Sequence, residues 1–155
     1  MSKVHCLKMV QTIPASLDAT WAFFSDPGNL EVLTPPSLHL KIVNSVFGDG
    51  LYPGQIMLYT VKPLAGLSFS WMTEITHVQP LRMFVDEQRK GPYQFWHHQH
   101  HFKTVEAGVE MTDLVHYRLP LGWLGDLFHR PLVQKKLDEI FTFRFAKIAE
   151  LFGET

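Results

Sequence analysis

Residues 67–76 of the chain read Leu-Ser-Phe-Ser-Trp-Met-Thr-Glu-Ile-Thr, and this stretch shows the clearest two-residue alternation in the sequence. Its odd-numbered positions, from Leu67 through Phe69 and Trp71 to Ile75, carry large apolar side chains apart from one threonine. Because side chains of a β-strand point alternately to opposite faces, this period predicts a strand with one face toward a core. The fold is therefore expected to be built around a sheet.

Other strand-like stretches surround this one, and turn residues such as Pro80, the Gly91-Pro92 pair and Gly108 separate them. Further strands are predicted at residues 3–13, 38–43, 56–61, 83–89, 94–105 and 109–119. Consecutive strands joined by short turns favour hairpins, and hairpins favour an antiparallel sheet.

Two short helices are predicted between the first strand and the second. Ser16 is a typical N-cap for a helix that runs through Phe24. Residues 26–33 predict a second short helix, because Pro27 suits a first helical position, and the prolines at 35–36 end it.

The C-terminal part changes to a helical period. Pro131 suits the start of a long helix, Gly153 suits its end, and residues 121–128 are expected to add a helical turn before it. One face of this helix collects apolar side chains: Val133, Leu137, Ile140, Phe141, Ile148, Leu151 and Phe152. The element order is strand, two short helices, six strands and one long helix, which indicates the α+β class.

Composition limits the functions that the chain supports. Its 155 residues fit one domain, and 14 basic against 15 acidic side chains leave a net charge of −1. This balance argues against electrostatic capture of nucleic acid or an anionic membrane. No stretch approaches the roughly 20 apolar residues of a membrane-spanning helix. Lys3 and Lys8 interrupt the pattern of a signal peptide, and the single cysteine, Cys6, excludes an internal disulfide. We therefore expect a cytoplasmic protein without an integral membrane segment.

Several local motifs resemble a known superfamily. They are Asn29-Leu30, residues 33–36, residues 84–88, residues 91–93, Trp96, His98, His100, Phe102, Met111, Asp113, Val115, Tyr117, Leu119-Pro120, Gly122, Ile140-Phe141 and Arg144. On these residues the chain resembles the START-like (SRPBCC) superfamily, which includes polyketide cyclases, lipid-transfer domains and pollen allergens. Within it, the chain is similar to a bacterial cyclase-like or cell-division-inhibitor-like ligand-binding subgroup. The resemblance implies one helix-grip domain over residues 1–155, in which a curved antiparallel seven-stranded sheet wraps around the C-terminal helix over a cavity.

Four histidines lie in the strand predicted at residues 94–105: His97, His98, His100 and His101. The alternation of a strand places His98 and His100 on one face with Trp96 and Phe102, and this aromatic bracket indicates the interior. Two histidines at i and i+2 are able to ligate zinc or copper when further ligands join them. Because no diagnostic metal motif accompanies them, we favour a hydrogen-bonded network and expect neither a metal site nor a cofactor.

The same parity argument directs Asp113 and Tyr117 inward. For residues 83–89 the pattern leaves the inward face open, and the resemblance favours the face of Asp86 and Gln88. On the long helix, Arg144 falls near the middle of the apolar face, where a buried cation requires a carboxylate. Asp113 and Asp86 are the expected partners.

These inferences predict an apolar cavity with a few convergent polar groups, which suits a small hydrophobic molecule with one polar end. The expected ligand-binding residues are Phe69, Trp71, Asp86, Gln88, Trp96, His98, His100, Phe102, Asp113, Tyr117, Phe141 and Arg144. The preferred function is the binding of a lipid-like, aromatic or polyketide-like ligand.

Two alternatives remain at this point. The first is a cyclase, dehydratase or isomerase in which Asp113 orients His98 or His100 as acid or base and Tyr117 donates to a carbonyl or enolate oxygen. The second is a protein-interaction module, monomeric or homodimeric, that uses the helix face of Leu132 and Phe143. The polar set also fits a purely structural role, in which each buried group satisfies a partner.

Overall fold

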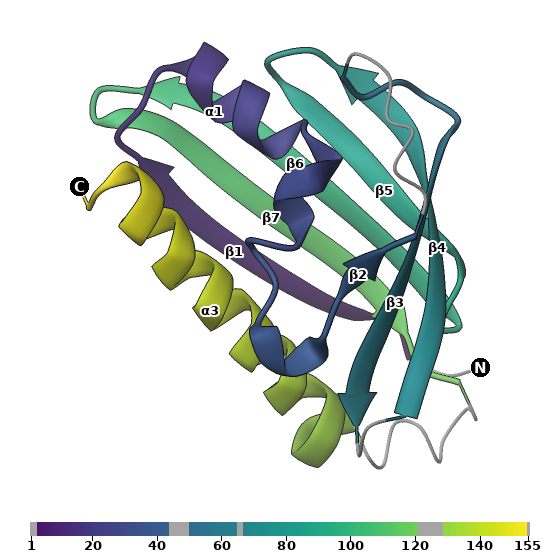
Figure 1. Cartoon of the computed structure of the whole chain (residues 1–155). Coiled ribbons are helices and arrows are strands. Elements are labelled where there is room, and N and C mark those ends of the chain that lie inside the picture. The colour runs from purple at the N-terminus through teal and green to yellow at the C-terminus, as the bar shows by residue number, and fades with distance from the viewer. Residues whose placement is uncertain (1–2, 44–49, 65–66, 121–128, 155) are drawn as a thin grey trace.

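A computed structural model describes residues 3–43, 50–64, 67–120 and 129–154 of the chain. Its centre is one curved antiparallel sheet of seven strands in the order β1-β7-β6-β5-β4-β3-β2 (Figure 1). The strands are β1 (His5–Ile13), β2 (Lys41–Ile42), β3 (Gln55–Leu64), β4 (Leu67–Gln79), β5 (Met83–Lys90), β6 (Phe95–Val105) and β7 (Gly108–Arg118). Each consecutive pair from β3 to β7 is a hairpin, as the short turns predict. The expected α+β helix-grip class is confirmed.

The helices lie on one side of this sheet. Ser16 is the N-cap of helix α1 (Leu17–Phe24), and its hydroxyl accepts a hydrogen bond from the Ala19 amide at 3.2 Å. The long helix α3 (Lys135–Phe152) contacts β1, and α1 contacts β6 and β7 (Figure 1). Gly153 ends α3 with φ 96°, and its amide donates to the Ala149 carbonyl.

Three local predictions are wrong in their bounds. The second short helix is only the 3-10 helix η1 (Pro27–Leu30), and the strand expected at residues 38–43 is reduced to β2. A 3-10 turn, η2 (Pro36–Leu38), precedes His39, whose left-handed φ of 44° ends any continuous strand there. A π-helical turn, η3 (His129–Gln134), precedes α3, so the regular helix begins later than Pro131. The helical turn expected at residues 121–128, and Gly122 within it, lie outside the described residues.

Two apolar clusters lie between the sheet and the helices. The first joins α1 and the C-terminal half of α3 to β5, β6 and β7, and it contains Phe24, Phe84, Phe102 and Ile148. The second joins the N-terminal half of α3 to the far ends of β6 and β7, and it contains Trp96, Val115, Tyr117, Leu119, Leu137 and Phe141. On β6 the buried positions between Trp96 and Phe102 are histidines, so the inward row of this strand changes from apolar to polar and back to apolar.

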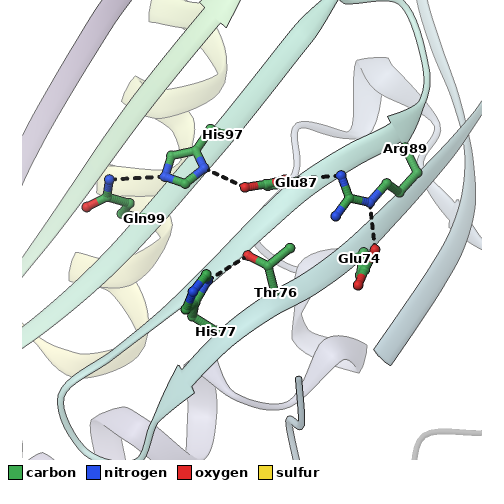
Figure 2. A network of polar contacts seen from close by, with 7 residues as sticks. All are labelled: Glu74, Thr76, His77, Glu87, Arg89, His97 and Gln99. Atoms are coloured by element: carbon green, nitrogen blue, oxygen red, sulfur yellow. Dashed lines mark hydrogen bonds and ion pairs between the residues drawn. The ribbon is translucent and has the colours of Figure 1, made fainter. Parts of the chain in front are cut away.

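A separate polar network covers the face of β4, β5 and β6 that points away from α3 (Figure 2). Arg89 Nε lies 2.6 Å from Glu74 Oε2, and Arg89 Nη1 lies 3.1 Å from Glu87 Oε2. His97 Nδ1 lies 2.8 Å from Glu87 Oε1 and takes its place on the outer face, as the parity of the strand predicts.

This outer network is expected to add little to stability. The Arg89 side chain is 44% exposed, and exposed ion pairs contribute about 0–1 kcal/mol because solvent screens them. We therefore expect Arg89→Ala to change the free energy of unfolding by less than about 1 kcal/mol in a urea titration. A loss as large as that of a buried ion pair would show that the network is structurally essential.

Candidate ligand-binding site

A cavity of about 630 Å³ lies between the sheet, α3 and the segment that leads from η1 to β2. This volume falls within the range of small-molecule sites. Most of its wall is apolar, and the main contributors are Leu33, Leu38, Met57, Val61, Phe69, Trp71, Ile75, Phe84, Trp96, Leu137, Ile140 and Phe141. Phe69 is 36% exposed and Leu132 is 50% exposed, so both belong to the part of the wall that solvent reaches.

Cross-strand register brings two histidines and two aspartates together at one end of this wall. Asp86 on β5 pairs with His98 on β6, and His100 pairs with Asp113 on β7. Because i and i+2 positions share a face, all four side chains point to the helix side of the sheet. His98 Nε2 lies 2.9 Å from Asp113 Oδ1, and His100 Nε2 lies 2.8 Å from Asp86 Oδ2.

The remaining ring nitrogens also face carboxylates. His98 Nδ1 lies 3.4 Å from Asp86 Oδ2, and His100 Nδ1 lies 2.9 Å from Asp113 Oδ1 without the geometry of a hydrogen bond. The two imidazole rings are 3.8 Å apart between centroids. Each histidine therefore stands between the same two carboxylates, in a cluster that is almost fully buried.

Arg144 completes the charges of this cluster from α3. Its Nη2 lies 3.5 Å from Asp113 Oδ1, which confirms that the arginine in the apolar helix face finds a carboxylate. The guanidinium carbon also lies 5.5 Å from the centre of the Phe24 ring, and the Nε is buried without a hydrogen-bond partner.

Mutual electrostatics decide which of these groups is charged. Burial alone would raise the pKa of Asp113, but Arg144 and the two histidines hold it well below its usual value. Burial likewise opposes ionisation of Asp86, but its electrostatic interaction with His98 and its hydrogen bond with His100 lower its pKa.

The pKa values of the two histidines shift in opposite directions. Burial lowers the pKa of His98, and the neighbouring charge of His100 adds to the effect. Burial also lowers the pKa of His100, but the contacts with Asp113 and Asp86 outweigh this effect and raise the pKa overall. The arrangement favours two carboxylates, a charged His100, a charged Arg144 and a neutral His98. Two neighbouring titratable groups whose pKa values shift in opposite directions are typical of acid–base sites as well as of structural networks.

Eight of the twelve residues expected to bind ligand line the cavity: Phe69, Trp71, Asp86, Trp96, His98, His100, Phe141 and Arg144. The other four, Gln88, Phe102, Asp113 and Tyr117, are not in its wall. Asp113 lies behind the two histidines and holds them from the β7 side.

The other three have identifiable structural contacts. Gln88 donates to the Tyr93 carbonyl and accepts from its amide, which fixes the turn between β5 and β6. Phe102 packs against Trp21 and Phe24 in the first apolar cluster. Tyr117 packs in the second cluster, and burial raises the pKa of its phenol to about 12.

Tyr59 is a polar residue of the wall that the sequence reasoning missed. Its hydroxyl lies 2.6 Å from Thr73 Oγ1, and burial together with the negative charge of Asp86 raises its pKa. The available signal was the alternation of β3, because Met57, Tyr59 and Val61 all occupy inward positions. Three polar residues of the wall also have atoms that are able to coordinate a metal ion, and these atoms lie within 4.8 Å of one another. The residues are Asp86, His98 and His100.

No protein-family model and no curated protein matches the sequence. Solved structures nevertheless match over nearly the whole chain. Protein CV1439 from Chromobacterium violaceum has a TM-score of 0.73 at 10% identity, covering 97% of this chain and 99% of that chain. The Zhui aromatase/cyclase from a Streptomyces species has a TM-score of 0.70 at 14% identity, covering 94% and 92%. Major latex-like protein 151 from Panax ginseng has a TM-score of 0.69 at 12% identity, covering 96% and 97%.

These likenesses establish the fold. The chain has the helix-grip fold, so the fold that the resemblance in the sequence implies is confirmed. Among the described residues, no helix has the length and apolar character that crossing a membrane requires.

Proposed function

We propose that the protein binds a small hydrophobic molecule, lipid-like, aromatic or polyketide-like, in the cavity between the sheet and α3. The observation that carries this proposal is a cavity of about 630 Å³ whose wall is mostly apolar and includes a buried polar patch of Asp86, His98, His100 and Arg144. Burial of an apolar ligand surface supplies the driving force, at roughly 25 cal/mol per Å². The proposed setting is the cytoplasm.

The polar patch gives the ligand an orientation. His98, His100, Asp86 and Arg144 all border the cavity, and the aromatic rings of Trp71, Trp96 and Phe141 border the rest of the same space. A ligand with one polar end, such as a carbonyl or an acidic group, would place that end toward the histidines and its apolar body against the rings. A few polar groups in an apolar wall are the usual source of such specificity.

A second candidate function is a cyclase, dehydratase or isomerase reaction in this cavity. It is supported by the buried contacts of His98 and His100 with two carboxylates, which would position either ring for proton transfer. The solved fold neighbour named as an aromatase/cyclase is consistent with this chemistry. Tyr117 is replaced in this candidate by Tyr59, because Tyr59 borders the cavity and Tyr117 does not.

Native mass spectrometry of freshly purified protein tests the binding function first. We expect a mass above that of the chain, and denaturation should release an organic molecule that is then identified. Protein stripped of such a molecule should bind the dye anilinonaphthalene sulfonate with one saturable site. A protein that carries no organic molecule and does not bind the dye would contradict the proposed function.

Truncation of the aromatic wall should weaken binding. We expect Trp96→Ala and Phe141→Ala each to lower the affinity for anilinonaphthalene sulfonate about three- to tenfold, because each removes a large apolar contact. Fluorescence titration measures the affinity, and circular dichroism checks that each variant is folded.

Phe95→Ala is the matched control for these two variants. Phe95 is adjacent to Trp96, is 38% exposed and is absent from the cavity wall, so its loss should leave the dye affinity unchanged. Unchanged affinity in both wall variants would show that the dye, and by extension the ligand, binds elsewhere.

A further inference from the structure

We propose that Asp86, His98 and His100 form a binding site for one divalent transition-metal ion at the polar end of the cavity. The sequence argued against a metal because no diagnostic motif accompanies the histidines. The geometry of the cluster points the other way, since its two aspartates occupy different positions relative to the imidazoles and divide between a ligand role and a supporting role.

The first observation is the convergence of three donor atoms. His98 Nδ1 and His100 Nε2 lie 3.4 and 2.8 Å from the same oxygen, Asp86 Oδ2. Ligand atoms of these three residues all lie within 4.8 Å of one another, and all three side chains border the cavity. Zn–N and Zn–O bonds are about 2.0–2.2 Å long, so small side-chain rotations would bring the donors onto one ion.

The second observation is the position of Asp113. Both outer ring nitrogens, His98 Nε2 and His100 Nδ1, lie 2.9 Å from the single oxygen Asp113 Oδ1. Asp113 itself is not in the cavity wall, and Arg144 contacts it from α3. A carboxylate that faces the outer nitrogen of a ligating histidine fixes the ring orientation and tautomer in many metal sites. Here one carboxylate would serve both rings.

The third observation is the charge of the cluster. Asp86, Asp113 and Arg144 together carry one net negative charge when both imidazoles are neutral, and the cluster is nearly excluded from solvent. In the metal-free cluster the proton of His100 balances this charge, and a metal ion coordinated by Asp86 and both histidines would balance it instead. Two histidines and one carboxylate leave coordination positions open toward the cavity, a ligand set used by zinc and non-haem iron sites.

Titration of tag-free, chelator-treated protein with Co²⁺ tests this site. Native mass spectrometry gives the number of ions bound per chain, and visible absorption reports the coordination of Co²⁺. The decisive variant is Asp86→Asn, which keeps the size of the side chain. His98→Ala and His100→Ala accompany it, and circular dichroism identifies any variant that does not fold. Asp113→Asn tests the supporting role, because its side chain would not touch the ion.

We expect one Co²⁺ per wild-type chain, an affinity loss of at least about 100-fold in Asp86→Asn, and a loss of about 10- to 100-fold in Asp113→Asn. His97→Ala and His101→Ala are the matched controls, because both histidines lie on the same strand but face outward, and neither should change the affinity. A wild-type protein that binds no Co²⁺ would overturn the proposal. So would binding that survives in Asp86→Asn, or binding that is lost in His97→Ala.

The metal site and the hydrophobic-ligand function are tested independently of each other. Co²⁺ binding with no binding of anilinonaphthalene sulfonate would contradict the hydrophobic-ligand function and leave the metal site intact. Dye binding without Co²⁺ binding would have the opposite meaning.

Discussion

Replacing Asp113 with alanine is expected to lower the free energy of unfolding by about 3–5 kcal/mol, the range for removal of one partner from a buried ion pair. The carboxylate lies 2.9 Å from His98 Nε2, 2.9 Å from His100 Nδ1 and 3.5 Å from Arg144 Nη2. Imidazoles that lose this partner can become neutral, but arginine stays protonated. The main cost is therefore a guanidinium left in an apolar environment without its nearest carboxylate.

Urea titration of three further variants isolates this cause. Asp113→Asn retains an acceptor oxygen and should lose less stability than the alanine variant. Adding Arg144→Met to Asp113→Ala should recover part of the loss, because the unpaired charge is then removed. Glu110→Ala, at an outward position of the same strand, should change stability by no more than about 0.5 kcal/mol. If Asp113→Ala lowered the free energy of unfolding no more than Glu110→Ala does, the contacts of Asp113 with the histidines and Arg144 would not stabilise the fold.

Filling the cavity from one wall is expected to abolish ligand binding without unfolding the protein. Met57 and Val61 occupy inward positions of β3, and both border the cavity. In the double variant Met57→Trp/Val61→Trp, two indoles would occupy space that the ligand needs. We expect the affinity for anilinonaphthalene sulfonate to fall at least about 100-fold, which corresponds to about 2.7 kcal/mol.

The matched control carries the same two substitutions on the opposite face of β3. Ile56 and Thr60 have the same spacing as Met57 and Val61, and neither is in the cavity wall. Ile56→Trp/Thr60→Trp should therefore keep the wild-type affinity within about threefold, or about 0.65 kcal/mol. Near-ultraviolet circular dichroism shows whether both variants keep their packing. An inward variant that is folded and still binds the dye with wild-type affinity would place the binding site outside this cavity.

Strand periodicity alone predicts the core of the polar cluster correctly. The two-residue alternation sends His98, His100 and Asp113 inward, and the position of Arg144 on the apolar helix face requires a nearby carboxylate. This reasoning succeeds because burial and parity are local properties of a strand or helix. The overall element order, which fixes the helix-grip fold, is equally local in origin.

The residues that the sequence misplaces depend on non-local geometry. Phe102 and Tyr117 point inward as predicted, but they pack against Trp21 and Trp96 rather than border the cavity. The alternation of a strand shows that a side chain points to the interior. Only the positions of the helices show whether that side chain packs against other residues or borders the cavity. Tyr59 and the η1–β2 segment were missed for the same reason, since their place in the wall depends on how distant elements cover the sheet.

Cross-strand register is a second property that the sequence does not reveal. The pairing of Asp86 with His98, and of His100 with Asp113, depends on the exact lengths of the β5–β6 and β6–β7 hairpins. A slip of one residue would send Asp86 to the outer face. The convergence of three potential metal ligands on one point was therefore visible only in the structure.

The most direct test of the central claim is a two-dimensional ¹H–¹⁵N NMR titration of the protein with anilinonaphthalene sulfonate. A ligand in the cavity lies against Trp71 and Trp96, which border it, and away from Gln99 on the outer face. We therefore expect saturable shifts of the two indole N–H resonances at one dye per chain, with the Gln99 resonances unchanged. Saturable shifts confined to the outer face, or indole resonances that do not respond to the dye, would contradict a ligand-binding cavity between the sheet and α3.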